Sequence, residues 1–271
     1  MTLAAFAPRP SNLPLSRQWT AAPAFAALTG LILLAAVPLL LAMALDPRVF
    51  QGESVWMKPL KFHLALSVYL GTLALYARYL PASWPAARRW RVYVAVVVGC
   101  ILLELLWIGG AAALGTASHF NVGSLFWSMA YAAMGVAAVT LTSASLVMGI
   151  GVWRNAGTGL HPALHLSLAL GLVLTFGLTV PVAGFMSQNL SHHVGVPATG
   201  ASLAVMGWSR EVGDLRVAHF LATHAMHALP LVGLLTRSQG VVWAAAAGYG
   251  LLVAGSFAQA ISGLPFLPWI G

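Results

Sequence analysis

The chain alternates long apolar runs with short polar connections, and this alternation is its dominant pattern. Each run is about 20 residues or longer and carries few charges, which matches the thickness of the hydrocarbon core of a bilayer. Runs of this length predict transmembrane helices rather than the shorter amphipathic helices of a soluble domain. Seven spans are expected, at about 22–45, 59–80, 92–114, 123–150, 162–185, 218–235 and 241–261. The pattern therefore predicts an all-α, polytopic membrane protein with one seven-helix transmembrane domain over residues 22–271.

The first 21 residues differ from the rest, because they contain three prolines, two arginines and no periodic apolar pattern. We expect them to form an arm on the membrane surface. The apolar run that follows ends in Ala42-Met43-Ala44, which resembles the cleavage site of a secretory signal peptide. At about 24 residues the run is longer than the apolar core of such a peptide, so it is expected to be retained as the first helix.

The amino-acid composition also indicates a membrane protein. Sixty per cent of the residues are hydrophobic, 7% are charged and the mean hydropathy is +0.87, which excludes an ordinary soluble domain. The net charge of +8 does not indicate nucleic-acid binding, because the cations are scattered at helix ends, where they meet lipid phosphates. The single Cys100 lies in an apolar run, so the sequence offers no disulfide framework.

The cations also predict an orientation. Eight of the thirteen fall on the side of the N-terminus and five on the other, and positive charge accumulates on the cytoplasmic side. The N-terminus is therefore expected in the cytoplasm and the C-terminus in the periplasm, in a bacterial inner membrane. The longest outer connection, at about 186–217, exceeds what geometry requires and is expected to form a periplasmic cap.

Polar chemistry is concentrated between Ser191 and Leu231, which hold two of the five acids and five of the nine histidines. Two histidines on facing helices at one depth can hold a b-type haem, and His63 and His224 are expected at comparable depths. Imidazole also binds Cu, Fe or Zn. The expected metal ligands are His63, His119, His192, His219 and His224. Separate polar roles between helices are the competing interpretation of these histidines.

Glu104 lies near the middle of the third expected span. A carboxyl group at that depth is costly when charged and unpaired, so we expect Glu104 to transfer protons or bind a ligand, with His227 as its partner. A structural hydrogen bond between helices is the alternative. Within the sixth span, His224 and His227 are three residues apart and share a helix face. Asp214 is a candidate catalytic or ligand-orienting acid. Ion pairs of Asp214 and Glu211 with Arg216 and Arg210 are the simpler expectation.

Lys58 and Lys61 flank a proline at the outer end of the second span, beside Trp56. Together with Trp208 of the cap they are candidates for binding a cofactor, a carboxylate or an anionic headgroup. Lysines that extend to the interface beside a tryptophan are an equally good interpretation. Ser118 and His119 are adjacent and expected to point apart, and the sequence has no Gly-x-Ser-x-Gly motif, which argues against a serine hydrolase.

Several of these stretches together resemble a family. They are Trp56-Met57-Lys58-Pro59-Leu60-Lys61-Phe62, Ser118-His119-Phe120-Asn121, and Gly213-Asp214-Leu215-Arg216-Val217-Ala218-His219-Phe220. They closely resemble a group of bacterial integral-membrane proteins whose activity is not established, over the second to sixth spans. The matching positions are His63, Glu104, His119, His192, His219 and His224. The chain departs from the group at His227, where the group has Gln, and at Ala111 and Leu114, where it has Gln and Arg.

Three functions are compatible with these features. The first is electron transfer or oxidoreduction by a haem or transition metal at the periplasmic side, with a lipophilic partner such as a quinone. The second is a zinc-dependent membrane hydrolase, in which three imidazoles hold the metal and activate water. The third is a proton-coupled transporter or ligand sensor that uses Glu104 and the outer histidines. Membrane lipid is an expected partner in each, a periplasmic or membrane protein is a possible one, and nucleic acid is not expected.

Overall fold

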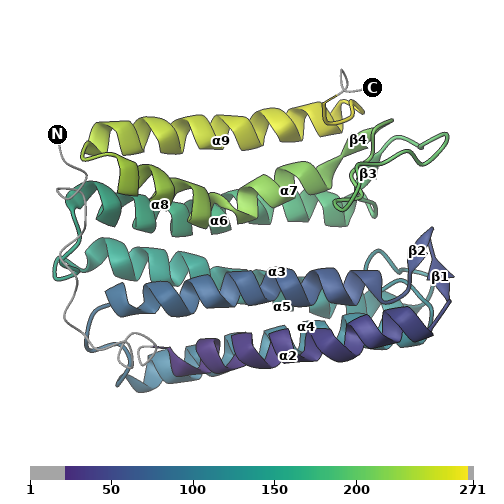
Figure 1. The fold of residues 1–271 in the computed structure, drawn as a ribbon, viewed down its shortest axis with the longest axis horizontal. Helices are drawn as coiled ribbons and strands as arrows, with labels where there is room; N and C mark the ends of the chain where they lie inside the picture. The colour runs from purple at the N-terminus through teal and green to yellow at the C-terminus, as the bar shows by residue number, and fades with distance from the viewer. Residues whose placement is uncertain (1–21, 268–271) are drawn as a thin grey trace. The chain divides into compact units, whose positions relative to one another are not determined.

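The computed structural model describes residues 22–267, which form long helices joined by shorter connections (Figure 1). The expected surface arm, residues 1–21, lies outside the described residues. Six helices are long and apolar enough to cross a membrane, and a seventh span results if the bent pair α7 and α8 is counted as one. The prediction of a polytopic α-helical membrane protein is thus confirmed in its class. The orientation and the count of seven spans stay predictions.

The chain divides into two compact units, Met1–Ala144 and Ser145–Gly271. The first unit contains α2 (Pro23–Leu45), α3 (Met57–Tyr76) with the short 3-10 helix η2 (Ala77–Tyr79), α4 (Arg88–Ala113) and most of α5 (Leu125–Arg154). The second contains the end of α5, then α6 (Pro162–Gln188), α7 (Leu215–Thr223), α8 (Ala225–Leu235) and α9 (Gln239–Ile261). The expected single transmembrane domain stays a prediction.

In the first unit, α2 packs along α3, and both contact α4. Tyrosines connect these helices to α5: the Tyr69 hydroxyl donates to the carbonyl of Leu141 at 3.0 Å, and the Tyr93 hydroxyl lies 2.7 Å from that of Ser143. A hairpin of β1 (Val49–Phe50) and β2 (Glu53–Ser54) joins α2 to α3. Its turn residues Gln51 and Gly52 have positive φ angles of 52° and 84°, as a two-residue hairpin turn requires.

In the second unit, α6 lies along both α7 and α8, and α9 packs against all three (Figure 1). The connection between α6 and α7 carries β3 (His193–Val194) and β4 (Gly213–Asp214), which pair antiparallel. Gly213 sits where β4 meets α9: a Cβ atom there would lie 1.9 Å from the carbonyl oxygen of Ala260. The segment 189–214 between α6 and α7, called the cap below, is therefore held against α9 at its C-terminal end.

The close contact of α6 and α8 yields a first prediction, at Gly233. A Cβ atom at this position would lie 1.9 Å from the Ser167 hydroxyl and 3.1 Å from the carbonyl oxygen of Ala163. Small residues allow such backbone approach in membranes, and filling the space costs about 1–3 kcal/mol. We therefore expect Gly233→Ala to lower the thermal unfolding temperature of the detergent-solubilised protein. Gly248→Ala is the matched control, because nothing lies within 4 Å of a Cβ atom there, and an equal effect of both changes would contradict the prediction.

Candidate functional site

The sixth apolar run is not one helix but two. It is interrupted at His224, where α7 ends and α8 begins at an angle of 48°. The sequence predicted an uninterrupted span over 218–235, so the break is a correction to that prediction. Membrane helices break only where the freed backbone groups find other partners, and such breaks commonly mark binding sites for substrates and ions.

Side chains from the neighbouring helices supply those partners. The backbone N–H of Met226, just after the break, donates to the Thr175 hydroxyl of α6 at 2.9 Å. The carbonyl of Leu221, just before it, accepts a hydrogen bond from the Tyr249 hydroxyl of α9 at 2.6 Å. Gly171 lets the backbone approach, because a Cβ atom there would lie 3.0 Å from the carbonyl oxygen of Ala225. The break is thus a built feature of the second unit.

Two histidines lie at this break. The Nδ1 atoms of His224 and His227 are 3.0 Å apart, and the ring centroids are 4.9 Å apart. At this distance the two rings form a hydrogen bond when one Nδ1 carries the hydrogen and the other accepts it. The Phe220 ring covers His224 from the preceding turn, with centroids 4.2 Å apart. The expectation that His224 and His227 share a face is confirmed.

Asp214 organises the junction of the cap with α7. Its side chain is fully buried and accepts hydrogen bonds from the backbone N–H of Ser209 and from Arg216, whose guanidinium lies 2.6 Å from Oδ2. His193 Nε2 lies 3.6 Å from the same oxygen. Burial alone would raise the pKa of Asp214, but the partners His193 and Arg216 bring it well below its usual range. The ion pair with Arg216 is as expected, and Asp214 has the contacts of a structural acid.

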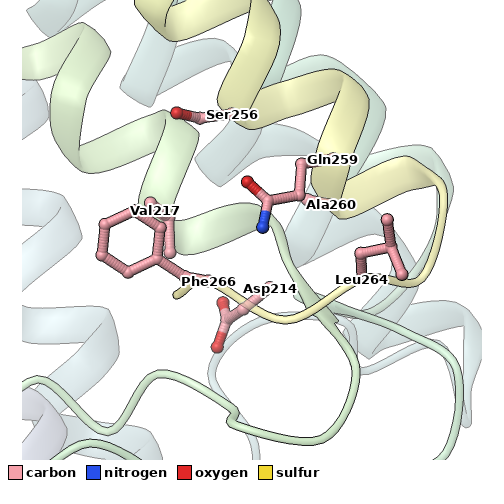
Figure 2. A pocket seen from close by; sticks show the side chains of 7 residues that line it. All are labelled: Asp214, Val217, Ser256, Gln259, Ala260, Leu264 and Phe266. Atoms are coloured by element: carbon pink, nitrogen blue, oxygen red, sulfur yellow. The ribbon is translucent and has the colours of Figure 1, made fainter. Parts of the chain in front are cut away.

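The face of Asp214 toward α9 borders a small pocket (Figure 2). Gln259 and Phe266 reach into this pocket, and the Gln259 amide donates to the carbonyl of Pro265 at 2.6 Å. Trp208 of the cap stacks edge-on against Phe220 and Phe266, with ring centroids 5.5 and 5.6 Å away. These contacts assign Trp208 to packing between the cap, α7 and the end of the described chain.

Glu211 holds the outer part of the cap. Its carboxylate accepts hydrogen bonds from the backbone N–H groups of Ala198, Thr199 and Ala201 and from the Thr199 hydroxyl. The carboxylate therefore cradles a turn of backbone rather than pairing with Arg210 as expected. The hydrogen bond from the Thr199 side chain, followed by those from the backbone, lowers the pKa of Glu211 from 4.5 to about 2.

This lowered pKa predicts a pH dependence of the cap. Because the pKa is lower in the folded state, the contribution of Glu211 to stability is present above pH 4.5 and is lost as the pH falls toward about 2. We expect pepsin to cleave residues 198–211 increasingly between pH 4.5 and 2, and Glu211→Gln to be cleaved readily across the whole range. Cleavage in the connection at 155–160, measured in the same samples, serves as the reference for the change of pepsin activity with pH. Equal cleavage of both proteins at every pH would contradict the prediction.

In the first unit, a buried acid contacts a histidine. Glu104 in α4 is only 3% exposed, and its Oε1 lies 3.3 Å from Nε2 of His119 in the connection between α4 and α5. Its Oε2 is buried and has no hydrogen-bond partner in the described part of the chain. Burial lowers the pKa of His119 and outweighs the neighbouring carboxylate, which raises it. The partner of Glu104 is thus His119, whereas the sequence suggested His227.

His119 is held from its other side by Ser118. The Ser118 hydroxyl lies 3.1 Å from His119 Nδ1, so the expectation that these adjacent side chains point apart is wrong. Phe120, with a φ angle of +61°, turns the backbone here, and the Trp107 indole donates to the carbonyl of Ser118 at 2.7 Å. Aromatic rings of Phe62, Phe120 and Tyr131 surround the imidazole. His119 therefore connects a serine hydroxyl to a buried carboxylate.

The remaining candidates of the first unit lie along α3. His63 is 9% exposed, and its Nδ1 donates to the carbonyl oxygen of Pro59 at 2.8 Å, which leaves Nε2 as the nitrogen without a hydrogen in the neutral ring. Lys61 pairs with Glu53 at 3.2 Å, and the Trp56 indole donates to Asp46. Lys58 is exposed and acts electrostatically on Glu104 and His119. Only Lys58 of the two expected anion-binding lysines therefore lies without an acid paired to it among the described residues.

The other expected metal ligands are in the second unit. His192 stacks on His193, with ring centroids 4.1 Å apart, and His219 lies half-buried in α7. Over residues 22–267, no three histidine, cysteine, aspartate or glutamate side chains lie close enough together to hold a metal ion. The expected metal site of His63, His119, His192, His219 and His224 gains no support from this arrangement.

The sequence identified Glu104, His119 and His224 but missed the three residues that build the break: Gly171, Thr175 and Tyr249. A threonine and a glycine one turn apart in an apolar helix were one signal, and such pairs are common in membrane helices. Pro230, which cannot donate to the carbonyl of Met226, was another. Comparison of the chain with family models, with curated proteins and with solved structures finds no match in any of the three.

Proposed function

We propose that this protein is a proton-coupled transporter of a bacterial inner membrane. The observation that carries the proposal is the broken span, with the Nδ1 atoms of His224 and His227 in hydrogen-bond contact at the point where the helix is interrupted. Discontinuous helices place polar groups at the depth where transporters bind substrate and coupling ions. A break of this kind can also act as a hinge, because a few residues there can absorb a change in the angle between the two helices.

The first unit contributes a second proton-binding pair. Glu104 and His119 form a buried acid and base in contact, and one carboxylate oxygen is left without a hydrogen-bond donor. Ionisable groups at membrane depth commonly form proton relays. Neutral His119 can donate Nε2–H to Glu104 Oε1 while its Nδ1 accepts from the Ser118 hydroxyl, so the imidazole connects the hydroxyl to the carboxylate in one chain of hydrogen bonds.

Proton movement in vesicles tests the proposal. The full-length protein is reconstituted into liposomes that contain a pH-sensitive dye, and the external pH is stepped from about 7.5 to about 6. Choline, succinate and Zn²⁺ are added separately, as probes for an organic cation, an organic anion and a divalent metal ion. We expect one class to accelerate internal acidification in liposomes with the protein, and His224→Gln with His227→Gln to remove that acceleration. If no class gives protein-dependent acidification, the proposal is wrong.

Electron transfer through a haem is a second candidate, favoured by His63. A metal-binding imidazole typically donates its other ring N–H to a backbone carbonyl, as His63 Nδ1 does to Pro59. His224 similarly uses Nδ1 toward His227 and retains Nε2. His63 would be one ligand of the haem, which would supply one-electron chemistry with a quinone as partner. Purified protein would then show a Soret band that His63→Ala removes, and its absence after expression with added haem would exclude this candidate.

A further inference from the structure

A groove on the first unit lies against α4, near the N-terminus of that helix. It is a shallow, widely open hollow with a volume of about 660 Å³, and it is lined by Arg88, Arg89, Val92, Tyr93, Val96 and Thr140. Pockets for small ligands typically range from about 300 to 1,000 Å³. The Tyr93 hydroxyl, 2.7 Å from that of Ser143, links α4 to α5 at the groove. The groove is thus large enough for part of a lipid molecule.

The lining of the groove is almost wholly apolar, and Arg88 and Arg89 contribute to it at the N-terminal turn of α4. Arg88, Val92 and Val96 are spaced four residues apart, so they follow one face of α4. Val92 and Val96 are 54% and 48% exposed, and the distance from Arg88 to Val96 along the helix is about 12 Å. A phospholipid fits this arrangement, with its phosphate headgroup at the two arginines and an acyl chain along the two valines.

Among residues 22–267, the two arginines have no carboxylate partner. Each of the five acids is engaged elsewhere: Asp46 with Arg48, Glu53 with Lys61, Glu104 with His119, Asp214 with Arg216, and Glu211 with the backbone of the cap. Guanidinium groups bind phosphate oxygens in paired hydrogen bonds. Basic pockets between membrane helices bind anionic lipid headgroups, and the side with more cations is the one expected to face the anionic cytoplasmic leaflet.

From these observations we infer that the groove is a binding site for an anionic phospholipid. Arg88 and Arg89 hold the phosphate, and one acyl chain lies against Val92 and Val96. The site is independent of the transport proposal, because it uses none of the residues at the break or at Glu104.

Native mass spectrometry of the full-length protein in detergent tests the site. Phosphatidylglycerol and phosphatidylcholine with identical acyl chains are titrated separately, and phosphatidylglycerol is expected to bind more tightly. In Arg88→Gln with Arg89→Gln, its affinity should fall about 30-fold, which corresponds to about 1 kcal/mol for each arginine. The matched control is Arg91→Gln with Arg154→Gln, which removes the same charge outside the groove.

Two further arms separate a lipid site from a simple anion site. Val96→Trp fills the groove without changing charge and should weaken phosphatidylglycerol binding, while millimolar inorganic phosphate should not displace the lipid. Equal binding of the two lipids by the unaltered protein would overturn the inference without any variant. It would also be overturned if the groove variant and the control lost the same affinity, or if free phosphate displaced the lipid.

Discussion

Replacing Asp214 by alanine is expected to lower the melting temperature of the detergent-solubilised protein by about 6–12 °C. The change leaves the Ser209 N–H without its acceptor and the part-buried Arg216 without its counter-ion. Breaking a buried ion pair by removing one partner costs about 3–5 kcal/mol, and the exposed part of Arg216 favours the lower value. At about 2–4 °C for each kcal/mol in a chain of this size, the stated shift follows.

Fluorescence-detected size-exclusion chromatography after heating measures this shift. Glu53→Ala is the matched control, because it removes an acid from an exposed pair with Lys61 and is expected to cost about 1 kcal/mol or less. Asp214→Asn retains the shape of the side chain, and its melting temperature should lie between those of Asp214→Ala and Glu53→Ala. A melting temperature of Asp214→Ala equal to that of the control would show that the carboxylate does not organise the cap.

Replacing Glu104 by glutamine is expected to reduce solute-dependent proton uptake in liposomes at least tenfold. Glutamine has nearly the same shape and can remain beside His119, but it cannot take up or release a proton. Proton relays through membranes require each member to change protonation, so one fixed group interrupts the relay. The melting temperature should fall less than in Asp214→Ala, because the packing around residue 104 is retained.

Infrared difference spectroscopy gives a second readout that does not depend on transport. Difference spectra recorded with and without the transported solute should contain a carboxylic acid C=O band that is absent in Glu104→Gln and present in Glu53→Gln. Retained proton uptake in Glu104→Gln would remove Glu104 from the relay. Lost uptake with the band unchanged would assign the effect to structure rather than to proton transfer.

The apolar runs predicted most of the helices because bilayer thickness alone sets their length. The expected spans at 22–45 and 162–185 correspond to α2 and α6, whose observed ends are within a few residues. The break at His224 could not be predicted in this way. Pro230 indicates an irregularity near Met226 but not its position or angle, and the backbone partners Thr175 and Tyr249 lie about 50 and 25 residues from the break. Local sequence carries no information about such distant partners.

The sequence predicted a site residue where burying its side chain in a membrane is energetically costly. It did not predict contacts that depend on the conformation of a loop. A single glutamate among leucines identified Glu104 from the sequence, since an intramembrane acid requires an explanation. Its partner was not predictable, because His119 reaches it only through a loop in which Phe120 has a positive φ angle. Glu211 was misassigned to Arg210 for the same reason: the amides that it binds converge only once the cap is folded.

The broken span also constrains how the protein is made. With nine and eleven residues, α7 and α8 are about 14 and 17 Å long, so neither crosses a hydrocarbon core of about 30 Å by itself. Thr175 on α6 is synthesised before the break and is ready to accept the Met226 N–H. Tyr249 on α9 follows it, so the Leu221 carbonyl lacks this donor until α9 has been inserted. During biosynthesis, α9 is therefore the helix whose arrival completes the second unit.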